Sequence, residues 1–228
     1  MRCPRCVQEV AADSALCPHC GFGLAALDEV FGEDAVILDR LTDAARCLRL
    51  RDREAIEESL DRFEEMFPQL FAAVYLGFLP RMTSIRQFGF WLMNRAAVTS
   101  VDYTKPNDHG ILLVVDLNSQ SASLTLGYRV EPFLRERDLM GILKSGHAGL
   151  AAGDYGRGVR KSLKQLKRVL RMRALWAGRR MERLAGRYHR PQEEGEIGLK
   201  PIRENHGEVG PTGTKKLEEA VEEEWGER

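Results

Sequence analysis

Four of the five cysteines in this 228-residue chain stand in two CxxC pairs within the first twenty positions. The pairs read CPRC and CPHC, and ten residues separate them. Thiols in this arrangement form disulfides, act as a redox pair or bind a metal ion. Each possibility predicts a different compartment and a different role for the rest of the chain. The four residues are Cys3, Cys6, Cys17 and Cys20.

The surrounding sequence favours metal binding over the other two possibilities. Charged residues interrupt the N-terminus, so it lacks the apolar stretch of a signal peptide. No window approaches the ~18 apolar residues that a membrane helix needs. We therefore expect a cytoplasmic protein, in which structural disulfides are disfavoured. A redox CxxC pair normally opens a helix after a strand, and we expect no strand before either pair.

Two CxxC pairs supply the four thiolates that a structural zinc ion takes in a tetrahedral site. Gly21 follows the last cysteine and allows the tight turn in which backbone N–H groups point at sulfur. A segment this short cannot bury a core, so its folding depends on the metal. The sequence predicts a zinc ribbon over residues 1–25, with no open catalytic position and with a fold independent of the remaining chain.

The net charge of zero conceals two oppositely charged segments near the C-terminus. Residues 157–190 are rich in Lys and Arg, whereas Glu dominates from position 192 onward. We predict a basic helical extension over residues 173–190 and a disordered acidic tail over residues 191–228. The extension is a candidate for binding an acidic partner, an anionic membrane surface or nucleic acid. The candidate residues are Arg171, Arg173, Trp176, Arg179, Arg180, Arg183 and Arg187.

Between the cysteines and the basic extension, helical patterns alternate with apolar strands. Helical spacing of apolar residues is present in REAIEESLDRFEEMFPQ, and SIRQFGFWLMNRAAV is typical of a second helix. The runs LFAAVYLGFL and GILLVVD lack polar alternation, which predicts buried strands, and ASLTLGY follows the second one after a turn. Two more helices are expected in RERDLMGILKSGHAGL and DYGRGVRKSLKQLKRVL. The sequence predicts an α/β domain with a central, largely parallel sheet, one hairpin and helices on both faces.

Several of these segments, in this order, resemble the TPM domain family, which is named partly for thylakoid lumen phosphatase-like proteins. The resemblance covers residues 34–172. It includes an asparagine-containing turn before a strand in NDHGILL, the element GYRVE, and a GDY motif that opens the last helix. Several motifs in the right order are more specific than any one of them.

The resemblance also implies a candidate ligand or divalent-ion site on loops at strand ends. Asp43 matches an acidic position in the family's first loop. Asn107 and Asp108 precede a predicted strand, and Glu131 follows the hairpin. Such loops bind ligands in α/β sheets, and clustered oxygen atoms suit calcium or magnesium. The alternative is that these residues serve turn geometry and helix ends alone.

The sequence leaves three functions open. A zinc ribbon without an open ligand position usually mediates contacts, so the leading hypothesis is an interaction or adaptor module with a protein partner. The family resemblance implies, as an alternative, a weak divalent-metal-dependent phosphatase. A third possibility is electrostatic binding of nucleic acid or an anionic membrane through the basic extension.

Overall fold

The computed structural model describes residues 2–11, 14–34, 36–80, 84–98 and 107–188, with side chains described as far as position 175. The chain divides into two units, Met1–Ala185 and Gly186–Arg228, and the following account concerns the first. The predicted acidic tail lies outside the described residues. Within the described residues, no helix is long and apolar enough to cross a lipid bilayer.

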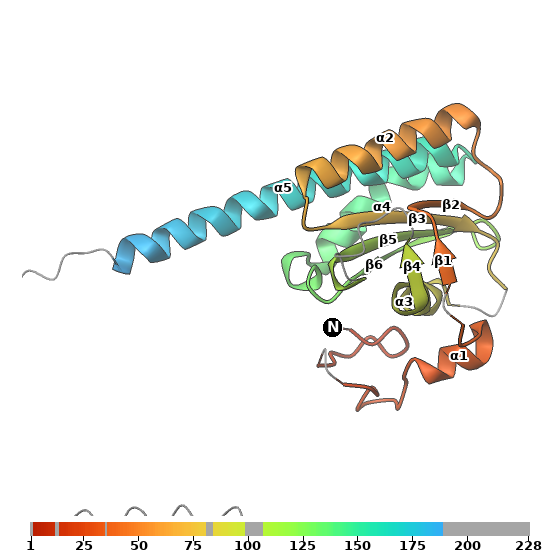
Figure 1. Cartoon of the computed structure of the whole chain (residues 1–228), viewed down its shortest axis with the longest axis horizontal. Coiled ribbons are helices and arrows are strands. Elements are labelled where there is room, and N and C mark those ends of the chain that lie inside the picture. Colours follow the sequence, from red (N-terminus) through yellow and green to blue (C-terminus); the bar gives the residue numbers. More distant parts are fainter. Residues whose placement is uncertain (1, 12–13, 35, 81–83, 99–106, 189–228) are drawn as a thin grey trace, which may run out of the picture. The chain divides into compact units, whose positions relative to one another are not determined.

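A four-stranded sheet with the order β2-β3-β5-β6 forms the centre of the fold (Figure 1). The strands β2 (Leu41–Asp43), β3 (Phe71–Gly77) and β5 (Gly110–Asp116) are parallel to one another. The last strand, β6 (Ser121–Leu126), is antiparallel to β5. The predicted α/β fold with a largely parallel sheet and one hairpin is therefore confirmed.

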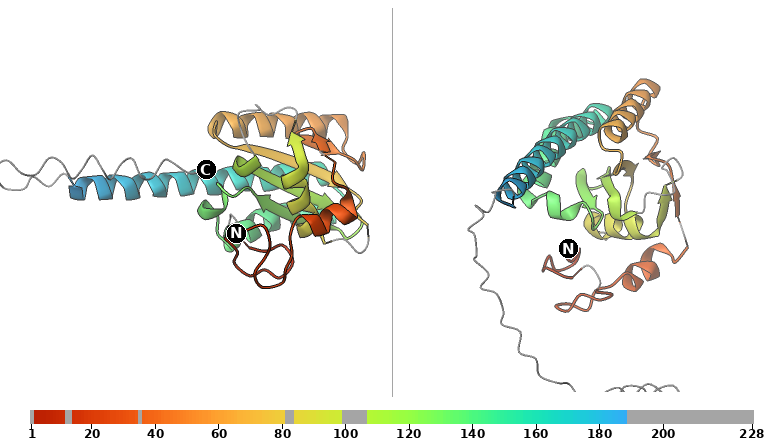
Figure 2. Two further views of the ribbon diagram at one scale, coloured as in Figure 1. Left: turned by 60° about the horizontal axis from the view of Figure 1, so that its bottom comes forward. Right: turned by 60° about the vertical axis from the view of Figure 1, so that its left-hand side comes forward.

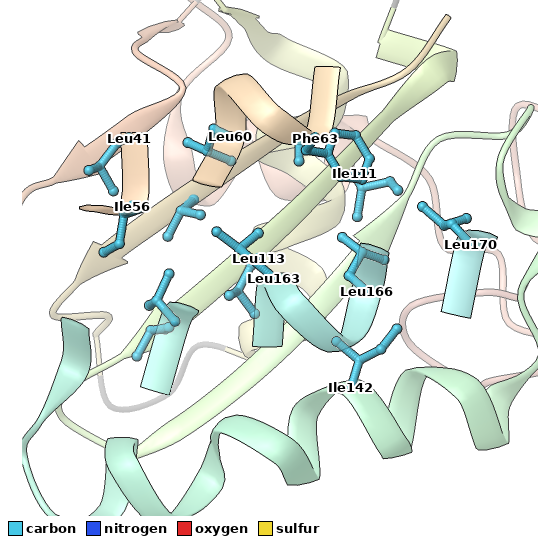
Figure 3. Packing of buried hydrophobic residues seen from close by; sticks show 14 of the residues in the cluster. Leu41, Ile56, Leu60, Phe63, Ile111, Leu113, Ile142, Leu163, Leu166 and Leu170 are labelled. Carbon is cyan, nitrogen blue, oxygen red and sulfur yellow. The ribbon is translucent and has the colours of Figure 1, made fainter. Parts of the chain in front are cut away.

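Three helices cover one face of this sheet, namely α2 (Leu50–Met66), α4 (Glu136–Ala151) and α5 (Tyr155–Tyr188). Figure 1 shows α2 and α5 side by side over the strands. Their apolar residues form one buried cluster with alternate residues of β3 and β5, because side chains alternate between the two faces of a strand. Figure 3 shows Ile142 of α4 directed toward Leu166 of α5 within this cluster.

The opposite face is covered by α3 (Ile85–Arg95), while α1 (Ala25–Phe31) and the cysteine segment lie on the same side and pack against α3 (Figure 2). Phe22 follows the second CxxC pair, and its ring centroid lies 6.3 Å from that of Phe90 on α3. The second buried cluster joins the two parts and contains Cys3, Val10, Cys17, Phe22, Leu27, Ala73, Phe88, Trp91, Leu92, Leu112 and Val114. The few apolar residues of the ribbon therefore share a buried cluster with the sheet, and an independent fold of residues 1–25 stays a prediction.

A buried ion pair fixes the first helix to α3. The carboxylate of Asp28 is almost fully buried and accepts hydrogen bonds from Arg95 Nε at 2.9 Å and from the Trp91 indole at 3.2 Å. The hydrogen bond from Arg95 lowers the pKa of Asp28, although burial acts in the opposite direction. A buried carboxylate is tolerated only with such partners, so this contact sets the position of α1.

The helix α3 is shorter than the sequence predicts. We expected SIRQFGFWLMNRAAV to be helical throughout, but its last residues form a strand, β4 (Ala96–Val98). This strand pairs in parallel with β1 (Val36–Leu38) in a separate two-stranded sheet. Asn107 ends the helix, because its side-chain amide donates to the carbonyl oxygens of Met93 and Ala96, both at 2.8 Å. A long-range cap of this kind leaves no local signal in the sequence.

The helices α4 and α5 approach each other closely through glycines. A Cβ atom at Gly149 of α4 would lie 2.7 Å from the backbone nitrogen and 2.8 Å from the Cα atom of Gly158 on α5. Such distances are shorter than any relaxed contact, and backbone atoms cannot move aside as a flexible side chain can. The two glycines therefore allow the helix pair to pack against the sheet as one layer.

We predict that Gly149→Ala lowers the free energy of unfolding by about 2 kcal/mol or more, because the added methyl group overpacks the α4–α5 contact. The matched control is Gly141→Ala in the same helix, where a Cβ atom meets nothing within 4 Å. That variant should gain up to about 1 kcal/mol from helix propensity. Urea denaturation measures both, and an unchanged midpoint for Gly149→Ala would contradict the close approach.

Candidate functional site

The sulfur atoms of the four N-terminal cysteines converge on one point. All four lie within 4.8 Å of one another, and no other such group of metal-binding side chains is present among the described residues. The Cys3 and Cys20 sulfurs are 3.8 Å apart, and those of Cys6 and Cys17 are 3.6 Å apart. A disulfide would need about 2.05 Å, whereas four ligands of a tetrahedral zinc ion lie about 3.8 Å apart. The thiol cluster therefore has the dimensions of a metal site.

The two CxxC pairs form two similar knuckles. In each, the residue after the second cysteine has a positive φ, namely 66° at Val7 and 66° at Gly21. Each turn is closed by a backbone hydrogen bond to the first cysteine of its pair, from Val7 to Cys3 at 3.0 Å and from Gly21 to Cys17 at 2.8 Å. Glycine adopts this conformation without strain, but a β-branched valine does not. The sequence indicated the second turn through Gly21 and gave no sign of the first.

The surroundings of the thiols distinguish two of them. Burial disfavours the Cys17 thiolate, but hydrogen bonds from the backbone of His19 and Cys20 and from neighbouring thiols lower its pKa to about 6. The backbone N–H of Phe22 favours the Cys20 thiolate, yet burial and the other cysteine sulfurs raise its pKa to about 12. Four thiolates at this distance repel one another, so a cation at their centre is what allows all of them to be deprotonated.

A groove of about 1580 Å³ begins at the first knuckle. Residues of α3, of α4, of the strand β6 and of the first knuckle line it. We refer to it below as the β6 groove. It is lined by residues 2–5 and 7, by residues 84–86, 90, 93 and 94, by residues 107, 108, 120 and 122–128, and by residues 131, 134–137, 139–141, 143, 144, 147 and 150.

Three of the four predicted ligand-site residues lie at this groove. Asn107 uses its amide to end α3, as described above. Asp108 and Glu131 lie near the phenol of Tyr128, whose pKa is raised by burial and by these two carboxylates. Glu131 Oε1 also accepts a hydrogen bond from the backbone N–H of Arg2 at 3.2 Å. Both carboxylates thus lie close enough to Tyr128 to act on its phenol.

The fourth residue, Asp43, lies at the other end of the sheet. It pairs with Leu76 near the carboxyl end of β3, whereas Asn107 and Asp108 belong to the turn Asn107–His109, which leads into the first residue of β5. The seven-residue strands separate these ends by roughly 20 Å. The side chain of Asp43 accepts hydrogen bonds from the backbone of Cys47 at 3.0 Å and of Leu48 at 2.9 Å. All four residues follow or precede strands, but the sequence pattern did not distinguish the two ends of the sheet.

Asp116 is a buried carboxylate that sequence reasoning missed. One oxygen accepts from the backbone N–H groups of Leu79 at 2.9 Å and Asn118 at 3.0 Å. The other accepts from the backbone and the hydroxyl of Ser119, at 3.2 and 2.5 Å. Burial opposes ionisation, but these hydrogen bonds outweigh it and lower the pKa of Asp116. Asp116 thereby fixes the two loops that follow β3 and β5.

The predicted partner-binding residues are only partly described. Helix α5 continues through the predicted extension to Tyr188. Arg171 is exposed, whereas Arg173 forms an ion pair with Asp138 of α4, so the fold uses its charge. The side chains of the other five, Trp176, Arg179, Arg180, Arg183 and Arg187, lie outside the described part of the chain. Binding through them stays a prediction.

These observations define an α/β domain with a mostly parallel central sheet and a four-cysteine cluster of zinc-ribbon type on one side of it. A comparison with protein families identifies the domain: the TPM domain matches residues 41–169. The chain therefore belongs to the TPM domain family, as the sequence motifs predicted. The match does not include the cysteine cluster.

Solved structures are similar to the domain at low sequence identity. The N-terminal domain of the cg2496 protein from Corynebacterium glutamicum is 10% identical, with a TM-score of 0.45 over 57% of this chain and 78% of that chain. The N-terminal domain of a P. gingivalis protein is 20% identical, with a TM-score of 0.45 over 57% and 81% of the two chains. The BA42 protein from Bizionia argentinensis is 10% identical, with a TM-score of 0.47 over 55% and 83%. The comparison with curated proteins finds no match.

We predict that Asp116→Asn lowers the free energy of unfolding by about 2 kcal/mol at pH 7. Both oxygens of Asp116 accept hydrogen bonds, whereas the amide nitrogen of asparagine cannot accept one. The pKa of Asp116 is lower in the folded state, so its stabilising effect is full above the unfolded-state pKa and is lost as the pH falls through the folded-state pKa. The difference between wild type and variant should therefore shrink below about pH 4. Thermal melts at several pH values measure this.

Glu57→Gln, at an exposed position of α2, is the control for removing one negative charge. It should leave the melting temperature almost unchanged at pH 7. An Asp116→Asn variant that is as stable as this control would contradict the role given to the buried carboxylate.

Proposed function

We propose that this protein is an interaction module in which the cysteine ribbon and the TPM domain bind one protein partner together. The observation that carries the proposal is the composition of the β6 groove, whose walls come from both parts of the chain. Arg2 connects them directly, since its guanidinium forms an ion pair with Glu136 of α4 and its backbone N–H donates to Glu131. Because residues of the ribbon line the same groove as residues of the TPM domain, the ribbon has a binding role in this proposal as well as a structural one.

The apolar lining of the groove supports this proposal. Met140 of α4 and Val7 of the first knuckle line it and are 62% and 43% exposed, although both are apolar. Exposed apolar side chains that gather in a concave surface are typical of binding sites, whereas single ones are common anywhere. The β6 groove is the surface that we propose for the adaptor function predicted from the sequence.

We predict that a photo-crosslinking amino acid at position 140 captures a protein partner in living cells. The matched control places the same amino acid at position 57, an exposed position on α2 that does not line the groove. Both forms should be purified under denaturing conditions, and the captured proteins identified by mass spectrometry. Capture at neither position, or the same proteins at both, would contradict a partner-binding groove.

Zinc is the metal that we propose for the cysteine cluster. Four thiolates at tetrahedral spacing suit zinc, and a closed shell of four protein ligands is typical of structural sites. Cys3, Cys6, Cys17 and Cys20 would hold the ion and keep the two knuckles together. Because the ribbon contributes buried residues to the core beneath the sheet, the metal would also stabilise the domain.

We predict close to one zinc ion per chain after purification under reducing conditions, measured by elemental analysis. Cys6→Ser should lose most of this zinc and lower the melting temperature of the whole domain, because ribbon and sheet share a core. Cys47→Ser is the matched control: Cys47 is a free cysteine outside the cluster, and its replacement should keep the zinc. A wild-type chain that contains no zinc, or iron alone, would refute the assignment.

A divalent-ion site at Asp108 and Glu131 is the second candidate, and a phosphoester hydrolase would be built on it. The observation that favours it is the position of both carboxylates beside Tyr128. Calcium or magnesium takes carboxylate and carbonyl oxygens, and the phosphatase alternative predicted from the family resemblance requires such an ion. Asp43 takes no part in this version of the site, because it lies at the opposite end of the sheet.

We predict that millimolar calcium or magnesium raises the melting temperature of the wild type by mass action, and that Asp108→Asn abolishes the increment. Asp43→Asn is the control: it should lower the melting temperature itself but keep the increment. If neither ion shifts the melting temperature of the wild type, the ion site and the phosphatase both lose their support.

A further inference from the structure

The strand β6 forms an edge of the sheet with unused hydrogen-bonding groups. The register pairs Gly110 with Gly127, and the N–H of Gly127 donates to the carbonyl oxygen of Gly110 at 2.8 Å. In an antiparallel pair, residues alternate between bonding to the partner strand and pointing away from it. The N–H and C=O groups of Ala122, Leu124 and Leu126 therefore point away from β5. No described residue forms a hydrogen bond with these outward groups.

This edge lacks the features that usually protect one. Natural edge strands carry a lysine, a proline, a bulge or an inward-pointing charge that prevents further pairing. The strand SASLTL contains no charged residue and no proline, and its register with β5 runs without a bulge. Every residue of β6 is partly exposed, whereas every residue of β5 is buried. The outer edge of the sheet is therefore competent to pair with another strand.

The β6 groove lies along this edge and carries an excess of positive charge. Six of its lining residues are Arg or Lys, namely Arg2, Arg5, Arg86, Arg135, Arg137 and Lys144. Three are acidic, namely Asp108, Glu131 and Glu136, and Arg2 contacts the last two of these. Arg86, Arg137 and Lys144 form no ion pair with any described residue. The charge that remains available in the groove is positive.

We propose that β6 binds an extended acidic segment of a partner protein, which pairs with the free edge as a fifth strand of the sheet. This inference rests on the proposed function and adds to it the mode of binding and the chemistry of the partner. Backbone hydrogen bonds to an exposed sheet edge supply affinity in this mode, and side-chain pockets supply specificity. A six-residue edge accommodates about 20 Å of peptide. Carboxylates on that peptide complement the unpaired cations of α3 and α4.

A second copy of this chain fits the edge less well than a peptide does. Pairing two β6 edges would bring two positively charged grooves together, and like charges across an interface cost free energy. The groove walls also flank the edge on both sides, because α3 and α4 line it together with β6. A single extended strand needs less room between the two helices than a second sheet with its own helices.

The test uses the full chain and a fluorescein-labelled peptide of four Glu-Val repeats, followed by fluorescence anisotropy. We expect saturable binding that weakens with added salt, because the charges are exposed. A Lys-Val peptide of the same length should bind at least tenfold more weakly. A Glu-Val peptide that is N-methylated at every second residue keeps its charge but cannot pair as a strand, and it should also bind at least tenfold more weakly.

Amide hydrogen exchange followed by NMR tests strand pairing directly. On addition of the Glu-Val peptide, the outward N–H groups of Ala122, Leu124 and Leu126 should exchange more slowly. The inward N–H groups of Ser123 and Thr125 already belong to the β5–β6 ladder and should change little. Binding without protection of the three outward groups would mean a purely electrostatic contact and would overturn the proposal.

Two sets of variants separate the edge from the charge. Ala122→Pro removes one outward N–H and keeps the ladder to β5, since proline is tolerated where the N–H faces away from the sheet. Its control is Ala122→Val, which keeps that N–H.

The charge of the groove is tested by Arg86→Glu combined with Lys144→Glu, which reverses two groove charges. Its control is Arg51→Glu, on the exposed surface of α2. Ala122→Pro and the double charge reversal should each weaken binding at least tenfold, and the two controls should not.

The outcomes distinguish this proposal from the broader one. If cross-linking from position 140 captures a partner but the Glu-Val peptide does not bind, the interaction module stands and the acidic strand is refuted. If sedimentation shows a dimer that Ala122→Pro converts to a monomer, a second copy occupies the edge and the proposal is also refuted. Capture at position 140 together with protection of the outward amides supports both.

Discussion

Burial of the central strands on both faces is the constraint on which the rest of this structure depends. All seven residues of β5 are buried, and six of the seven residues of β3 are buried as well. Parallel strands of this kind need a layer on each face. The helices α2, α4 and α5 supply one layer. The other layer combines α3, α1 and the cysteine ribbon, so a segment too small to form its own core completes the core of the domain.

The same arrangement leaves β6 as an open edge. Three parallel strands extend the sheet from β5 toward β2, and the hairpin adds β6 on the other side. Because α3 and α4 lie on opposite faces of the sheet, their neighbouring sides flank the β6 edge, and residues of the first knuckle also line the space between them. The groove is therefore a direct consequence of the topology. The positive charge that remains available in it comes from Arg86 on α3 and from Arg137 and Lys144 on α4.

Local patterns in the sequence predict much of the fold, and long-range contacts account for what they miss. GILLVVD and LFAAVYLGFL lack polar alternation, and this alone predicts two central strands. The motifs CPRC and CPHC predict a compact cysteine cluster, because two CxxC pairs at a short separation are typical of metal sites. The short strands β1 and β4 carry no comparable signal. Asn107 ends α3 by a hydrogen bond to Met93, although it lies twelve residues beyond the last residue of that helix. Asp116 of β5 accepts a hydrogen bond from Leu79, in the loop that follows β3.

Under the two proposals made above, metal binding and partner binding would be coupled through the first knuckle. Arg2, Cys3 and Arg5 line the groove, and Cys3 is also a member of the thiol cluster. A ligand that binds more tightly when this wall is ordered must, by thermodynamic linkage, make the metal bind more tightly by the same factor. Four thiolates would close the coordination shell of the ion, so it would offer no open position to a substrate. Its contribution to function, under the proposal made here, is to hold Arg2 and Arg5 beside the open edge of β6.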